Sequence, residues 1–133
     1  MLSSGSSSFL RRVLLADAAI SGVAGLLLAL DAGGLEGMLG APAAFLRYAG
    51  LSLLPFAALV AAVAGRERPS HPGVWTVIGL NAAWVVASGV VALSGGFDLT
   101  ALGLTFVIGQ AIAVAGLAEL QYVGLRKAAA ATA

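Results

Sequence analysis

Four long apolar runs constrain the fold of this chain more than any other feature of its sequence. They cover residues 11–31, 43–65, 73–94 and 99–125, approximately. Each has the roughly 20 residues that an α-helix needs to cross a hydrocarbon core about 30 Å thick. Inside a bilayer the backbone polar groups must be paired within the segment, which favours a helix for each run. The sequence therefore predicts an all-α, polytopic membrane protein built as a four-transmembrane-helix bundle.

Composition agrees with a membrane location and excludes several classes of function. Hydrophobic residues make up 60% of the chain and charged residues 10%, against about 45–50% and about 25% in soluble domains. Seven Lys/Arg nearly balance six Asp/Glu, so no basic surface indicates nucleic acid. Cysteine is absent and His71 is the lone histidine, so we expect no conventional metal site and no cofactor. Sequence motifs of catalysis are also missing, which argues against an enzyme.

The domain plan is a single transmembrane domain, residues 11–127, between two short tails. Residues 1–10 are rich in Ser and Gly, and residues 128–133 are mostly Ala. Residues 1–8 cannot bury enough apolar surface to become ordered, so the first tail is expected to be flexible and cytoplasmic, and the second tail is expected to be cytoplasmic. A secretory signal peptide is the alternative for the N-terminus. It is disfavoured because the first run exceeds the usual apolar core of about 7–15 residues and contains Asp17.

The distribution of charge predicts an orientation. Basic residues near the ends of spans usually stay on the cytoplasmic side. In this plan one side carries six basic residues and the other three acidic ones; they are Arg11, Arg12, Arg66, Arg68, Arg126 and Lys127, and Asp31, Glu36 and Asp98. Only Arg47 falls on the acidic side. We therefore expect a multi-pass protein of the bacterial inner membrane with both termini in the cytoplasm.

The two halves of the chain share a pattern. Each has a polar residue followed by two alanines, a glycine at the same offset, and a closing glycine pair: Asp17-Ala18-Ala19, Gly25 and Gly33-Gly34, against Asn81-Ala82-Ala83, Gly89 and Gly95-Gly96. A duplication would be of the parallel kind, because spans one and three run in the same direction. Chance is the alternative in a chain dominated by Ala, Gly and Leu.

Three polar residues inside the spans are the best candidates for a site. With a helical rise of about 1.5 Å per residue, Asp17, Asn81 and Glu119 lie roughly 8–14 Å inward from the cytoplasmic ends of their helices. A carboxylate that faces lipid at such depth is costly. We therefore expect the three side chains to converge, so that the two acids share a proton or exchange it for a cationic substrate.

Each acid has a purely structural alternative. Each acid could be buried singly, either neutral or hydrogen-bonded to one of the nearby polar side chains, or it could reach water near the interface; those side chains are Ser21, Asn81, Gln121 and Tyr122. Glu119 is close to Gln121 and Tyr122 at the membrane surface. Ser21 is therefore a candidate either as a ligand-binding residue or as a cap.

Two further polar side chains lie deeper. Trp84 lies one turn beyond Asn81 and could line a pocket or stack on a ligand cation, with core packing as the alternative. Gln110 lies nine residues before Glu119, which places the two on opposite faces of one helix. One of these faces could meet a second protomer.

The topology and the stretch Leu80-Asn81-Ala82-Ala83-Trp84-Val85-Val86-Ala87-Ser88 resemble small uncharacterised four-helix inner-membrane proteins of high-GC bacteria. This resemblance implies no particular activity. The chain length and the carboxylate of the first span also resemble small multidrug resistance transporters, which implies proton-coupled export by a homodimer. The acid here is Asp17 rather than Glu, Glu119 is additional, and the other motifs of that family are not matched.

Two functional hypotheses follow from the sequence. The first is a non-enzymatic membrane bundle that binds a small hydrophobic or cationic molecule, a lipid or a membrane partner. Its polar cluster would consist of Asp17, Asn81 and Glu119, with Ser21 and Trp84 beside it. The second is a proton-coupled small-molecule transporter that acts as a dimer, in which Asp17 and Glu119 titrate.

Overall fold

The described residues form five helices and no strand. The computed structural model describes residues 2–132, with side chains placed for residues 7–130. The helices are α1 (Leu2–Leu30), α2 (Ala32–Leu39), α3 (Ala43–Ala64), α4 (His71–Leu93) and α5 (Ala101–Thr132). All except α2 contain a stretch long and apolar enough to cross a membrane. The predicted all-α bundle of four candidate membrane spans is thus confirmed.

The helices extend further than the predicted spans at the two termini. Residues 2–10, where a flexible tail was expected, continue α1, and residues 128–132 of the second tail continue α5; Met1 and Ala133 lie outside the described residues. The end of the N-terminal extension packs on α5: Leu10 and Leu125 are buried, and Lys127 lies 5.1 Å from the ring of Phe9. Contact of Phe9 and Leu10 with α5 is a feature that composition alone does not reveal.

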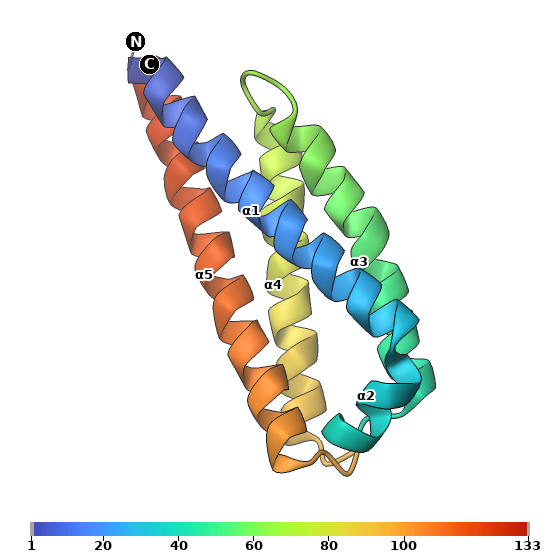
Figure 1. Cartoon of the computed structure of the whole chain (residues 1–133). Coiled ribbons are helices and arrows are strands. Elements are labelled where there is room, and N and C mark those ends of the chain that lie inside the picture. Colours follow the sequence, from blue (N-terminus) through green and yellow to red (C-terminus); the bar gives the residue numbers. More distant parts are fainter. Residues whose placement is uncertain (1, 133) are drawn as a thin grey trace.

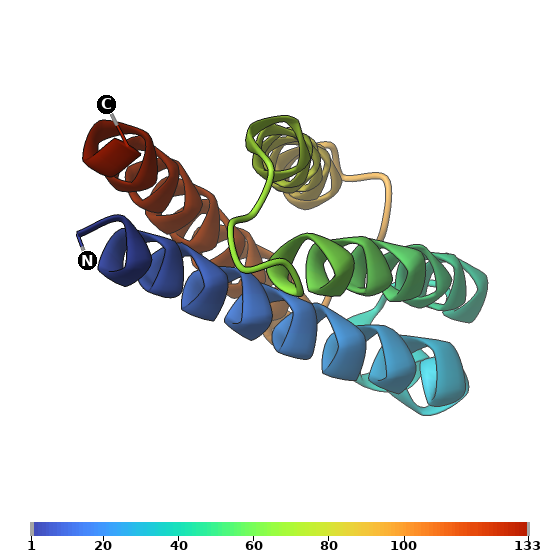
Figure 2. The same cartoon turned by 90° about the horizontal axis from the view of Figure 1, so that it is seen from above.

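Two helical hairpins make up the bundle. α1 packs mainly on α3, and α4 packs on α5; the hairpins meet through α1 and α5, whereas α3 and α4 make few contacts. Figure 1 shows both termini at the same end as the α3–α4 loop, and Figure 2 shows the two hairpins from above. A symmetric pair of repeats would give equal α1–α5 and α3–α4 seams, so the observed packing is asymmetric.

Glycine permits the close approach of α1 and α3. A Cβ on Gly50 would lie 2.6 Å from the backbone N of Ala29 and 2.7 Å from the carbonyl O of Gly25. Nothing larger than glycine fits without a shift of backbone. Close backbone packing of this kind matters in lipid, where no hydrophobic drive holds helices together.

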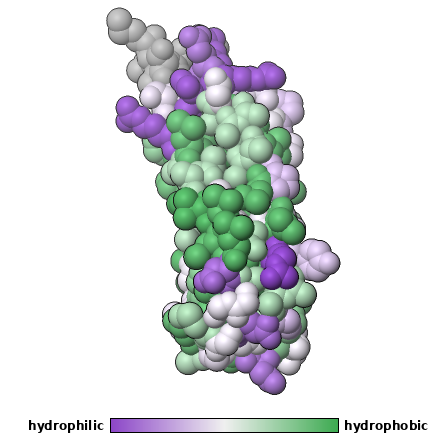
Figure 3. Space-filling view, turned by 45° about the vertical axis from the view of Figure 1, so that its right-hand side comes forward, coloured by the Kyte–Doolittle hydropathy of each residue, from purple (hydrophilic) through white to green (hydrophobic). Residues whose placement is uncertain are grey.

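Charge separates the two ends of the bundle. We call the end that carries the termini and the α3–α4 loop the basic end, because six of the seven Lys/Arg belong to it; the acidic end contains α2 and the α4–α5 loop, with Asp31, Glu36 and Asp98. Figure 3 shows a hydrophobic band across the middle of one face, with hydrophilic side chains toward both ends. This pattern is typical of a protein that crosses a membrane.

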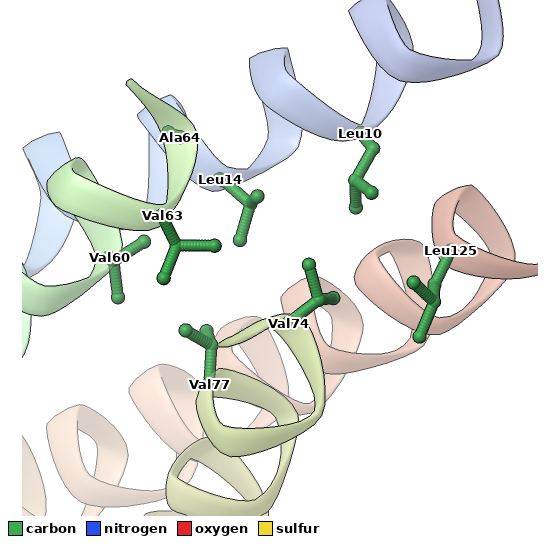
Figure 4. Packing of buried hydrophobic residues seen from close by; sticks show 8 residues of the cluster. All are labelled: Leu10, Leu14, Val60, Val63, Ala64, Val74, Val77 and Leu125. Atoms are coloured by element: carbon green, nitrogen blue, oxygen red, sulfur yellow. The ribbon is translucent and has the colours of Figure 1, made fainter. Parts of the chain in front are cut away.

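The basic end is filled by aliphatic side chains from all four long helices. This basic-end core consists of Leu10, Leu14, Val60, Val63, Ala64, Val74, Val77 and Leu125. Figure 4 shows these side chains converging between the helices. On α3 and α4 the packing is fixed at the loop itself, where Ser70 caps α4 by accepting a hydrogen bond from the backbone N of Gly73 at 3.2 Å.

The acidic end is closed differently, by the short helix α2. Residues 32–39 lie between the first two predicted spans, and they form a helix because Ala32 and Leu39 are buried beneath it. α2 ends at Gly40 in a left-handed conformation, with φ 80°. Thr100, just before α5, then donates its backbone N–H to the carbonyl O of Leu39 at 3.0 Å, which ties the loops together.

Candidate functional site

Asp17 is almost completely buried where α1 meets α4 and α5. Only 1% of its surface is exposed, and Asn81 on α4 and Gln121 on α5 are equally buried. Asp17, Ser21, Asn81 and Gln121 form one hydrogen-bonded group, which we call the Asp17 network. It joins three of the four long helices immediately beside the basic-end core.

The geometry of the Asp17 network is that of a closed ring. One carboxylate oxygen of Asp17, Oδ2, accepts from Asn81 Nδ2 at 2.8 Å and from Gln121 Nε2 at 2.6 Å. Asn81 Nδ2 also donates to Gln121 Oε1 at 3.1 Å, which closes the ring. The second oxygen, Oδ1, accepts from the hydroxyl of Ser21 at 3.1 Å. The carboxylate thus receives hydrogen bonds from three side chains.

All three donors to Asp17 are neutral. Arg11, one of the two arginines at the start of the first span, donates instead to the carbonyl O of Ala64 at 3.0 Å. Among the described residues no buried side-chain nitrogen or oxygen lacks a partner. A buried polar network that is fully satisfied rigidifies its surroundings and specifies one packing arrangement. The Asp17 network therefore fixes the contact between the two hairpins together with the aliphatic basic-end core.

A second polar group lies between α4 and α5, further toward the acidic end. Trp84 Nε1 donates to Gln110 Oε1 at 2.8 Å, and Gln110 Nε2 donates to Ser88 Oγ at 2.8 Å. Gln110 Nε2 also donates to the carbonyl O of Val107, and Ser88 Oγ to that of Trp84. We call Trp84, Ser88 and Gln110 the Gln110 network.

A cavity of about 420 Å³ occupies the acidic half of the bundle. Side chains of all five helices line it, and most of them are apolar. Its polar lining includes Ser21 of the Asp17 network, all three residues of the Gln110 network, and Ser52 and Tyr48 of α3. Asp17 itself does not line the cavity and lies behind Ser21. The cavity volume falls in the range of small-molecule sites, about 300–1,000 Å³.

The structure brings together most of the residues proposed from sequence. Asp17, Asn81 and Ser21 share one network, and Trp84 lines the cavity. Among the described residues no three His, Cys, Asp or Glu side chains form a group that could hold a metal ion.

Glu119 is the exception, because it is exposed and makes no hydrogen bond to the Asp17 network. The expected approach of the two acids is therefore wrong. The physical reason is helical geometry: Gln121 points inward, and two residues at about 100° each turn Glu119 to the other side of α5. Asp17 is capped instead by Ser21, Asn81 and Gln121, as the structural alternative expected for a singly buried acid.

Gln110 and Gln121 belong to the two networks but were not among the candidate site residues. Their spacing contains the signal that was overlooked. Eleven residues at about 100° each bring the helix back to within about 20° of the starting direction. Both amides therefore lie on the same face of α5, where they reach Ser88 and Trp84, and Asn81 and Asp17, respectively.

Comparison with known proteins yields no match. No protein family, no curated protein and no solved structure is significantly similar to the chain. The function has to be argued from the geometry of the cavity and the two networks.

Proposed function

We propose that the protein binds a small, mostly apolar molecule in the cavity of its acidic half and does not transform it chemically. The observation that supports this most strongly is the cavity of about 420 Å³ with its apolar lining and few polar groups. Such a combination is the usual composition of a small-molecule site. The polar groups would fix one end of the ligand, and the aliphatic and aromatic side chains would hold its body.

Access from the bilayer is the natural route into this cavity. α3 and α4 contribute to the lining but make few contacts with each other, so their seam is the weakest of the bundle. The opposite route is blocked by the Asp17 network and the basic-end core. A ligand that dissolves in the membrane would therefore enter sideways, in the half of the bilayer nearest the acidic end.

We also propose that the basic end faces the cytoplasm of a bacterial cell. The six basic residues gathered there support this orientation, since Lys and Arg near spans remain on the cytoplasmic side. The cavity would then lie in the outer half of the inner membrane.

Proton-coupled transport is less well supported than binding. It requires an acid that the substrate can reach, but Asp17 lies behind Ser21 and Glu119 lies outside the network. A path through the molecule would also have to open the basic-end core, in which Leu14, Val60 and Val74 are fully buried. Uptake driven by a pH gradient in proteoliposomes would be the evidence for transport.

Tryptophan fluorescence in lipid nanodiscs tests the proposed binding. Trp75 lies at the basic end against Tyr122 and does not line the cavity, so Trp75→Phe leaves Trp84 as the single reporter. A terminally brominated alkanol should quench Trp84 saturably, beyond the linear quenching caused by bromine dissolved in the lipid. If neither this probe nor its methyl ether quenches saturably, the proposed function is wrong.

A matched pair of α4 variants separates the cavity from the lipid-facing surface. Ala87 lines the cavity, whereas Ala82 is exposed on another face of the same helix. Ala87→Phe should lower probe affinity by at least about tenfold, and Ala82→Phe should leave it unchanged. In proteoliposomes, uptake of the same probe driven by a pH gradient would favour transport over binding alone.

A further inference from the structure

We call the side of the cavity formed by Ser21, Trp84, Ser88 and Gln110 its inner wall. The hydrogen-bond donors of this wall already have acceptors within the protein. The indole N–H of Trp84 is donated to Gln110, and both amide hydrogens of Gln110 are donated, to Ser88 Oγ and to the carbonyl O of Val107. The orientation of this amide is fixed by its partners, because an indole nitrogen can only donate and a carbonyl oxygen can only accept.

The hydroxyl hydrogens are also committed. Ser88 donates to the carbonyl O of Trp84, Ser21 donates to Asp17, and Ser52 donates to the carbonyl O of Tyr48. Tyr48, which is 71% exposed, is the remaining side-chain donor among the lining residues, and it lies on the opposite wall.

Lone pairs are what the inner wall still offers a ligand. Gln110 Oε1 accepts one hydrogen bond and Ser88 Oγ accepts one, while Ser21 Oγ accepts none. A carbonyl oxygen and a hydroxyl oxygen each have two lone pairs. The wall therefore presents three acceptors and no uncommitted donor. The side chain of Asp17 lies behind Ser21 and accepts its hydroxyl hydrogen.

We propose that the cavity selects amphiphiles whose polar end donates hydrogen bonds, such as an alcohol, a phenol or a primary ammonium group. This inference rests on the proposed function and specifies the chemistry of its ligand. An ether, ketone, ester or carboxylate of the same size would direct its lone pairs at the lone pairs of Gln110, Ser88 and Ser21. A site built to accept a donor rejects the analogue that lacks it, because the buried acceptors stay unpaired.

An alcohol and its methyl ether are the sharpest test of this selection. The two brominated probes share their chain and their bromine, and they differ in whether the head can donate. After correction for partition into the nanodisc lipid, the alcohol should bind at least about tenfold more tightly than the ether. Equal affinities, or tighter binding of the ether, would overturn the proposal while leaving the proposed binding function intact. The corresponding alkylammonium probe then shows whether Asp17 adds a preference for positive charge.

Gln110→Leu should reverse the chemistry of the wall. It removes the Oε1 acceptor and releases the indole N–H of Trp84 into the cavity as a donor. The preference for the alcohol should fall to about parity or invert, while binding of the ether improves. Thr105→Val is the matched control, because Thr105 is exposed on the same helix and its hydroxyl donates to the carbonyl O of Ala101.

Ser88→Ala provides a second variant in case Gln110→Leu fails to fold. It removes one acceptor and frees one amide hydrogen of Gln110, so the alcohol preference should shrink several-fold. If the preference in either folded variant stays as large as in the parent chain, the acceptors on this wall do not select the ligand and the proposal is wrong.

Discussion

The basic half and the acidic half of the bundle are built from the same four helices, yet one is filled and the other is hollow. In the basic half, aliphatic side chains and the Asp17 network close the space between the hairpins. In the acidic half the Gln110 network links α4 to α5 alone, and a cavity separates it from α1 and α3. A polar network that joins the two hairpins therefore holds them in contact. A network confined to one hairpin leaves room for a ligand between the hairpins.

The polar residues of the two halves accordingly have different proposed roles, structural in the basic half and ligand-binding in the acidic half. Asp17 is the most conspicuous residue of the sequence, but its carboxylate is enclosed by neighbouring side chains. Gln110 and Trp84 are half-buried and line the cavity. Stability should therefore depend most on the basic half and on the α1–α3 contact, and ligand binding on the acidic half.

The largest effect on stability is expected at the contact between α1 and α3. In Gly50→Ala the new Cβ meets the backbone of Ala29 and Gly25, so the helices must separate. We expect the free energy of unfolding, measured by SDS titration in mixed micelles, to fall by about 3 kcal/mol. Gly79→Ala is the control, since a Cβ at Gly79 meets nothing within 4 Å. It should change stability by less than about 1 kcal/mol, because alanine favours the helix. Similar losses in the two variants would show that α1 and α3 are not in backbone contact.

The next largest effect should come from removing the carboxylate of the basic half. Asp17→Leu leaves Gln121 Nε2 and Ser21 without their acceptor and removes one of the two acceptors of Asn81, and we expect a loss of about 2 kcal/mol in the same assay. Asp17→Asn should cost about 1 kcal/mol or less, because its carbonyl oxygen can still accept from Asn81 and Gln121. A loss as large for Asn as for Leu would indicate that the negative charge, rather than the hydrogen-bonded geometry, is what stabilises the bundle.

A smaller effect is expected when the same change is made in the acidic half. Gln110→Leu also removes a polar group with several partners, but these partners border a cavity that water or a ligand can enter. We expect a loss of about 1 kcal/mol, half of that for Asp17→Leu. If Gln110→Leu is the more damaging of the two, the Gln110 network, and not the Asp17 network, holds the bundle together.

The sequence predicted the spans well and the faces of the helices less well. Length and hydropathy identify four spans, and related positions in two of them anticipated the pairing of Asp17 with Asn81. The inward faces of α4 and α5 are harder to recognise, because residues that face lipid are as apolar as those that face other helices. For this reason Glu119 was placed in the cluster and Gln121 was not. Helix α2 and the helical tails depend on tertiary packing that no local pattern reveals.

The smallest effect on stability is expected at Glu119, and it tests whether Glu119 interacts with Asp17. Glu119→Gln removes a charge from an exposed position of α5, so stability should change by no more than about 0.5 kcal/mol. The decisive measurement is a double-mutant cycle with Asp17→Asn. Two acids that share a proton are strongly coupled, whereas side chains without shared partners are additive within about 0.5 kcal/mol.

Additivity would establish that the carboxylate of the basic half acts alone, as its enclosure by Ser21, Asn81 and Gln121 indicates. A coupling above about 1 kcal/mol would contradict this separation, since it requires the two acids to interact. Repeating the cycle at several protein-to-detergent ratios then assigns the interaction. A coupling that disappears on dilution arises between two copies of the chain, where the exposed Glu119 of one could meet the other. A coupling that persists arises within one bundle, and would mean that α5 turns Glu119 inward in part of the population.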